Sequence, residues 1–133
     1  MKLAKVDHIG IAVRDLDAAI EYFARRYGAK VASREEIPQD KVEEAMIQVG
    51  ESYIQLLAPT ADDSPVAKFL EKRGEGIHHI GFGVENLDGL LEELSAQDAQ
   101  LIDDRPRLGG GGKMVAFVHP KDGPGILVEL VQE

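Results

Sequence analysis

The sequence predicts an α+β fold in which two pseudo-symmetric βαβββ modules form a curved mixed sheet. The first observation is that the segment VDHIGIAV at 6–13 returns, slightly altered, as IHHIGFGV at 77–84. The second is that an amphipathic helical pattern follows each copy, and the third is that three strand-like segments follow each helical pattern. We expect a single domain over 1–133, divided into a module at about 3–60, a linker helix within about 61–76 and a module at about 77–133.

The two predicted helices carry matching start signals. The segment 14–28, RDLDAAIEYFARRYG, places apolar residues three and four positions apart, and the segment 85–99, ENLDGLLEELSAQDA, repeats that stripe. Asp15 and Asn86 are suitable N-caps, and Gly28 is a suitable stop. We therefore expect one helix to cover one sheet face in each module and the other face to remain free to curve around a site.

The predicted strands complete the two modules. Residues 50–52 form a tight hairpin turn, residues 119–125 form a longer turn, and a short linker helix lies around 65–73. The strands expected after the two helices are 29–36, 42–49 and 52–59 in the first module, and 99–106, 113–120 and 125–132 in the second.

Composition excludes several classes of protein. The chain has no cysteine, which rules out disulfides and thiolate chemistry. Its net charge of −9 argues against nucleic acid as a general partner. No apolar run reaches the roughly 18 residues that a membrane span needs. The start MKLAKVDHIG lacks the pattern of a signal peptide, so the simplest expected location is the cytoplasm.

Alternation along the first strand of each module predicts a cavity beside a histidine. Strand side chains alternate between the two faces. Bulky Ile9, Ile11 and Val13 suit the helix-covered face, which leaves His8, Gly10 and Ala12 on the opposite face. In the second copy the same parity leaves His79, Gly81 and Gly83 opposite the helix. A close-packed interior is not built from residues with almost no side chain, so each histidine is expected to face open space.

The last strand of each module adds one polar residue to the same face. Gln55 lies between Ile54 and Leu56, and Glu129 lies between Val128 and Leu130. Two imidazoles, an amide oxygen and a carboxylate make a hard-to-borderline set that suits Co²⁺, Mn²⁺, Fe²⁺, Ni²⁺ or Zn²⁺. The predicted ligands are His8, Gln55, His79 and Glu129.

Each of these residues also has an ordinary structural interpretation. A histidine on a strand is often structural, Gln55 could be a satisfied core amide, and Glu129 could be a surface carboxylate. His78 has the opposite parity, so we expect it to be structural or to support a ligand. His119 has cavity parity and could compete as a ligand.

One carboxylate breaks the symmetry of the two modules. In 42–49 the residues Ala45, Ile47 and Val49 suit the helix-covered face, so Glu44 faces the cavity while Glu43 has the other parity. The residue that matches Glu44 in the second module is the apolar Val115. Glu44 is therefore the candidate for a one-sided acid or base, unless it is simply a surface glutamate of an edge strand.

Several stretches carry a resemblance to a known family. They are VDHIGIAV, VEEAM, YIQLLAP, the S-x-VAKFL segment at 64–70, GEGIHHIGFGV, RPRLGGGG and HPKDGPGILVEL. With the paired modules, they make the chain resemble the vicinal oxygen chelate (glyoxalase/dioxygenase) superfamily and, within it, the methylmalonyl-CoA epimerase family over nearly the whole length. The features specific to the epimerases are Gln55, Glu44 and the HPKDGPG-x-L-x-E segment.

The resemblance implies a metal-dependent isomerase of propionate metabolism that interconverts (2R)- and (2S)-methylmalonyl-CoA. It implies one divalent metal ion per subunit, with Co²⁺ the first expectation, held by His8, Gln55, His79 and Glu129. It also implies that Glu44 and Glu129 act as opposing acid and base, that the small-molecule partner is an acyl-CoA, and that the chain forms a homodimer.

The glycine run at 109–112 does not fit a nucleotide phosphate loop, because no Ser or Thr follows Lys113. It is either a flexible hairpin loop or a place where bare backbone N–H groups approach the substrate. The weaker candidates for substrate binding are Gly110, Gly111, Gly112, Lys113, Arg105 and Lys121, with Arg107 nearby.

Three other functions share this fold. A glyoxalase I-type metal lyase would use a similar ligand set. An extradiol dioxygenase usually holds Fe²⁺ with two histidines and one carboxylate, and Gln55 argues against it. A binding protein without catalytic activity would dispense with the metal ligands, whereas all four are present here.

Overall fold

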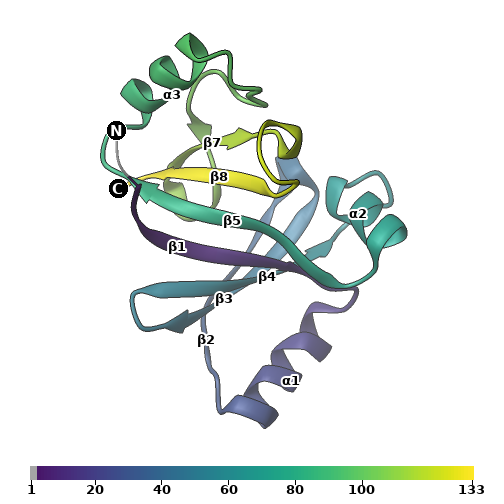
Figure 1. The fold of residues 1–133 in the computed structure, drawn as a ribbon. Helices are drawn as coiled ribbons and strands as arrows, with labels where there is room; N and C mark the ends of the chain where they lie inside the picture. Colours follow the sequence, from purple (N-terminus) through teal and green to yellow (C-terminus); the bar gives the residue numbers. More distant parts are fainter. Residues whose placement is uncertain (1–2) are drawn as a thin grey trace. The chain divides into compact units, whose positions relative to one another are not determined.

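The computed structural model describes residues 3–133 as two compact units (Figure 1). We call residues 8–78 the N-terminal unit, and residues 79–133 together with residues 3–7 the C-terminal unit. Strand β1 (Leu3–Ala12) contributes to both, because the division falls between Asp7 and His8. Parallel and antiparallel pairs occur together with helices, which confirms the predicted α+β class with mixed strand directions.

The N-terminal unit contains the first predicted module. Its strand order is β2-β3-β4-β1, with β3 antiparallel to both neighbours and β1 parallel to β4. The hairpin between β3 and β4 turns at Gly50, whose φ of 61° favours glycine. The elements that follow β1 are α1 (Leu16–Tyr27), β2 (Val31–Ile37), the 3₁₀ turn Pro38–Asp40, β3 (Val42–Val49), β4 (Ser52–Pro59) and α2 (Pro65–Arg73).

Helix α1 begins and ends where its sequence signals predict. The side chain of Asp15 accepts a hydrogen bond from the Ala18 N–H over 3.0 Å. Gly28 ends the helix with φ 64°, and its N–H donates to the Ala24 carbonyl. The apolar stripe of α1 packs on one face of the sheet, where the buried members of the cluster are Val13, Leu16, Ala45, Ile47, Leu56 and Ala58.

Helix α2 covers part of the opposite face. Ser64 caps this helix by accepting from the Val66 N–H, and Val66 and Leu70 then pack against Ala12 and Leu57. The expectation that the second face stays free therefore holds for only part of it. The part of that face around Ala12 and Leu57 is covered by α2. The position of this helix in the linker did not predict the contact.

The C-terminal unit contains the second module, with strand order β5-β8-β7-β6. Asn86 caps α3 by accepting from the Gly89 N–H over 3.0 Å, as predicted. Leu87 and Leu91 of this helix pack on Val84, Ala116 and Leu130. Its elements are β5 (Gly76–Val84), α3 (Leu87–Ala96), β6 (Arg107–Leu108), the 3₁₀ turn Gly110–Gly112, β7 (Met114–Val118), the 3₁₀ turn Pro120–Asp122 and β8 (Leu127–Gln132).

The prediction of a strand at 99–106 is wrong. That stretch makes only an isolated bridge between Leu101 and Val118, and the strand that pairs with β7 on the side away from β8 is the two-residue β6. The side chain of Asp103 accepts the N–H of Phe117 over 2.9 Å and so takes a position that a ladder hydrogen bond would fill. A helix of the length and apolarity needed to cross a membrane is not found in residues 3–133.

Candidate active site

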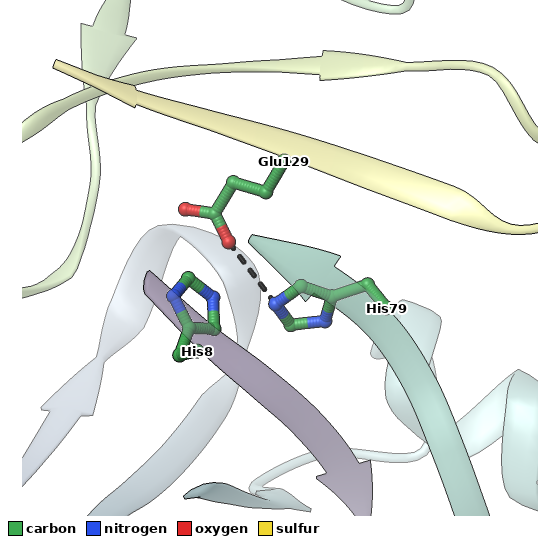
Figure 2. Close-up of side chains that lie close together, drawn as sticks. All are labelled: His8, His79 and Glu129. Atoms are coloured by element: carbon green, nitrogen blue, oxygen red, sulfur yellow. Dashed lines mark ion pairs between the residues drawn. The ribbon is translucent and has the colours of Figure 1, made fainter. Parts of the chain in front are cut away.

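His79 and Glu129 form a buried pair in the C-terminal unit. They lie on the parallel strands β5 and β8, where Glu129 is in register with Gly81. The Nε2 atom of His79 is 3.0 Å from Oε1 of Glu129 (Figure 2). Because only 3% of His79 and 8% of Glu129 is exposed, both polar groups are largely removed from water. A buried imidazole and a buried carboxylate at this distance are typical components of metal-binding and proton-transfer sites.

The His79 ring has an aromatic neighbour that sequence reasoning missed. Phe117 of β7 meets it edge-on at a ring-centroid distance of 5.9 Å. Phe117 is also in register with Glu129, so it lies beside both members of the pair. The pairing of the predicted strands, which puts Phe117 opposite Glu129, is what could have identified this neighbour. The guanidinium of Arg107 stacks over the Phe117 ring at 5.3 Å.

His8 and Gln55 lie on neighbouring strands of the N-terminal unit. Gly10 of β1 is in register with Gln55 of β4, and His8 is two residues before Gly10. Both side chains are buried, with 4% of His8 and 9% of Gln55 exposed. The Oε1 atom of Gln55 is buried and has no hydrogen-bond partner among the described residues. A buried amide oxygen left in this state is costly, unless a ligand or ion satisfies it.

Glu44 is joined to Gln55 across the β3–β4 pair. The Nε2 atom of Gln55 donates to Oε1 of Glu44 over 3.0 Å. Glu44 is 4% exposed, so its carboxylate is held within the fold. Glu43, one residue earlier, is half-buried and lies 3.6 Å from the guanidinium of Arg34. The two adjacent glutamates therefore face different surroundings, in agreement with their opposite strand parity.

The two remaining histidines have other contacts. The His78 ring meets Phe69 of α2 edge-on at 4.9 Å. The Nδ1 atom of His119 accepts a hydrogen bond from the Lys121 N–H over 3.0 Å and so caps the turn at Pro120–Asp122. This contact gives His119 a structural role at the strand end.

The glycine run is fitted closely to β7. A Cβ atom on Gly109 would lie 2.9 Å from the Val115 side chain, so this position has no room for one. Gly111 and Gly112 have φ values of 67° and 74°, in the region that favours glycine. Lys113, directly after the run, lies 3.9 Å from Asp7.

The other two basic candidates have neighbours of their own. Arg105 lines a cavity of about 790 Å³ together with Asp88 and Glu92 of α3. Lys121 is exposed on the turn after β7. The two cations therefore have different surroundings, one beside acidic side chains and the other in solvent.

Residues 7–117 match the family model of the Glyoxalase/Bleomycin resistance protein/Dioxygenase superfamily. The chain belongs to this superfamily. The same relationship holds over almost the whole chain in comparisons with single members of the superfamily, both by sequence and by structure.

Two relatives and one solved structure illustrate the match. The chain is 38% identical to the ethylmalonyl-CoA/methylmalonyl-CoA epimerase of Cereibacter sphaeroides, over 98% of each chain. It is 35% identical to the mitochondrial methylmalonyl-CoA epimerase of Homo sapiens, over 98% of this chain and 74% of the relative. A structure of a methylmalonyl-CoA epimerase in complex with methylmalonyl-CoA and NH₄⁺ superposes with a TM-score of 0.95 at 42% identity, covering 99% of this chain and 96% of the other.

Proposed function

We propose that this protein is an epimerase that interconverts (2R)- and (2S)-methylmalonyl-CoA. The observation that carries the proposal is the 38% identity over 98% of both chains to a relative named for this activity. The solved structure at 42% identity, which holds methylmalonyl-CoA, adds support for an acyl-CoA substrate. The buried polar side chains His8, Glu44, Gln55, His79 and Glu129 supply the groups that this chemistry needs.

We propose that His8, Gln55, His79 and Glu129 hold one divalent metal ion. These residues fit a metal ion because the buried Oε1 of Gln55 has no hydrogen-bond partner among the described residues, and a cation would satisfy it. Three of the four, His8, His79 and Glu129, form a group of ligand-type residues that could hold an ion (Figure 2). Nitrogen and oxygen donors without sulfur favour a hard-to-borderline ion, and Co²⁺ is our first choice ahead of Mn²⁺, Ni²⁺, Zn²⁺ and Fe²⁺.

The hydrogen on C2 of the substrate lies between a thioester carbonyl and a carboxylate. When bound, a divalent ion supplies Lewis-acid stabilisation of the negative charge that develops on the thioester oxygen. The protein must then remove the C2 proton on one face and return a proton on the other. This requirement calls for two separate acid–base groups.

We propose that Glu44 and Glu129 are these two groups. In one direction the Glu44 carboxylate takes the C2 proton, the C–H electron pair moves into the thioester to form the enolate, and the carboxyl group of Glu129 protonates C2 from the other face. The result is a protonated Glu44 and an ionised Glu129, and exchange with solvent resets both. The reverse reaction uses the same two residues with their roles exchanged.

Three finer points stay predictions. We propose that the N–H groups of Gly110, Gly111 and Gly112 and the cations Lys113, Arg105 and Lys121 contact the acyl-CoA, because bare backbone N–H groups and cations suit the carboxylate and phosphates of such a substrate. We also propose that the active form is a homodimer and that it works in the cytoplasm.

Deuterium exchange at C2 tests the proposed function. Methylmalonyl-CoA incubated with the protein in D₂O should lose its C2 proton signal in NMR, and both stereoisomers should appear. Treatment with a chelator should stop the exchange, and Co²⁺ should restore it. An unchanged C2 proton signal in the metal-loaded protein would reject the epimerase, and turnover of a glutathione hemithioacetal instead would identify a glyoxalase I-type lyase.

A further inference from the structure

The side-chain amide of Gln55 is held by Glu44. Its Nε2 donates to Glu44 Oε1 over 3.0 Å, between the adjacent antiparallel strands β4 and β3. Both residues are buried, at 9% and 4% exposure. The amide oxygen has no hydrogen-bond partner among residues 3–133. The contact with Glu44 is thus the hydrogen bond that fixes which way round the amide lies.

The two ends of an amide are not equivalent. Oε1 is an acceptor that can ligate a cation, whereas the NH₂ group is a donor without a lone pair to offer. A carboxylate accepts hydrogen bonds, so it attracts the NH₂ end and repels the oxygen end. A flip of the Gln55 amide would bring two oxygens together at Glu44 and turn the NH₂ group toward the place where the metal needs a ligand.

We propose that Glu44 is a positioning residue for the metal as well as an acid–base group. It orients the Gln55 amide so that Oε1 is presented as a ligand. This inference rests on the proposed metal site, and it assigns to Glu44 a second role that acid–base chemistry does not require. Groups that orient a metal ligand commonly change metal affinity by roughly 10–100-fold when they are replaced.

The decisive comparison uses a ligand that needs no orienting. Gln55→Glu replaces the amide by a carboxylate whose two oxygens are equivalent. If Glu44 acts by orienting the amide, the loss of its acceptor should weaken metal binding when residue 55 is Gln and should not do so when residue 55 is Glu. A residue that only supports the packing of β3 on β4 would weaken metal binding in both backgrounds.

The variants are Glu44→Met, Glu44→Gln, Gln55→Glu and the double variant Glu44→Met with Gln55→Glu. Co²⁺ is titrated into each chelator-stripped, full-length protein by calorimetry, and circular dichroism of the metal-free proteins checks folding. We expect Glu44→Met, which has no acceptor oxygen, to raise the Kd about 10–100-fold. Glu44→Gln retains an acceptor, so its Kd should stay within about threefold of the unsubstituted value, because a hydrogen bond of the same geometry remains available. In the Gln55→Glu background, Glu44→Met should leave the Kd unchanged or lower it, since it removes a repelling carboxylate.

Two results would overturn the inference while leaving the metal site intact. They are an unchanged Kd in Glu44→Met, and an equal rise in Kd in both backgrounds. Failure of the unsubstituted protein to bind Co²⁺ would instead reject the metal site itself, and the inference with it.

If Glu44→Met does not fold, the unsubstituted protein still gives an answer. The ¹⁵N side-chain NH₂ signal of Gln55, assigned by its loss in Gln55→Glu, should show slow hydrogen exchange before and after loading with diamagnetic Zn²⁺. Fast exchange in both states would mean that the NH₂ group is not held, and the inference would fall.

Discussion

Replacing Glu44 by Gln should abolish most of the epimerase activity and leave the structure intact. The amide and the carboxylate have nearly the same size, and the 3.0 Å contact with Gln55 Nε2 can be kept through the remaining oxygen. The site is 4% exposed, so a neutral side chain there adds no buried charge. What the substitution removes is the group that we propose takes or gives a proton at C2.

The size of the loss follows from the weight of one acid–base group. Such groups contribute about 10²–10⁴-fold to a rate, which corresponds to about 2.7–5.4 kcal/mol in activation free energy. We therefore expect kcat for epimerisation to fall by this factor while the metal content stays the same. Proton exchange from the stereoisomer that faces Glu129 should persist, because the second carboxylate is still present.

Glu43→Gln is the matched control, since it makes the same chemical change one residue away. Glu43 is half-buried and 3.6 Å from Arg34, on the side of β3 that faces away from Gln55. Partly exposed ion pairs of this kind contribute about 0–1 kcal/mol to stability. The control should therefore keep nearly full activity.

Steady-state epimerisation rates, metal content by elemental analysis and NMR-detected exchange of each stereoisomer decide the matter. The two-carboxylate mechanism fails if Glu44→Gln keeps most of its activity. It also fails if that variant loses activity only in proportion to a loss of metal, because Glu44 would then act solely through Gln55.

Three further predictions concern the metal, the core and the glycine run. His79→Ala should abolish tight binding of Co²⁺ in calorimetry, while His78→Ala, whose ring contacts Phe69, should not; equal losses would mean that the strand parity is wrong. Leu56→Ala should lower the free energy of unfolding in urea by about 2–5 kcal/mol, because Leu56 is fully buried; a loss below about 1 kcal/mol would mean that this core is loosely packed. Gly109→Ala should cost about 1–3 kcal/mol through overpacking, since its Cβ would lie 2.9 Å from the neighbouring valine side chain, and a fully stable variant in the same titration would contradict that geometry.

The repeat and the alternation of side chains predicted most of the fold. Strands β3 and β4 have the predicted limits, the N-caps Asp15 and Asn86 are confirmed, and the linker helix occupies the predicted range 65–73. These features depend on local rules, namely period-two alternation, capping and turn chemistry. They need no knowledge of which segments meet in space.

The failure at 99–106 has a physical cause that the alternation could not show. The first module has a seven-residue β2, and repeat symmetry predicted a similar strand here. The segment instead carries Asp103, whose carboxylate bonds the backbone N–H of Phe117 and is 3.4 Å from Arg107. A side chain that bonds the backbone of the neighbouring strand interrupts the ladder. A symmetric prediction misses this exception because it depends on a single side chain.

The sequence pattern also could not predict which face of the sheet α2 covers. The limits of the helix follow from Ser64, Pro65 and its apolar spacing. Its packing partner Ala12 lies on β1, far earlier in the chain, and an apolar stripe of two or three residues fits either face of a sheet. In the candidate site, too, local features were predictable and contacts between strands were not. That Glu44 and Gln55 share a face was predictable from parity, whereas the hydrogen bond between them depends on the register of β3 against β4.

The difference between the two modules at Glu44 and Val115 has a structural reason on each side. Glu44 is buried beside Gln55 and holds its amide. Val115, at the matching position of the second module, is 2% exposed and packs against Gly109, so it fixes the start of the glycine run. A carboxylate at 115 would put a buried charge against that run, and a valine at 44 would leave the Gln55 NH₂ group without its acceptor. Each module therefore uses the same strand position for a different task, and this asymmetry suits the proposed mechanism, in which the two faces of the substrate require separate proton-transfer groups.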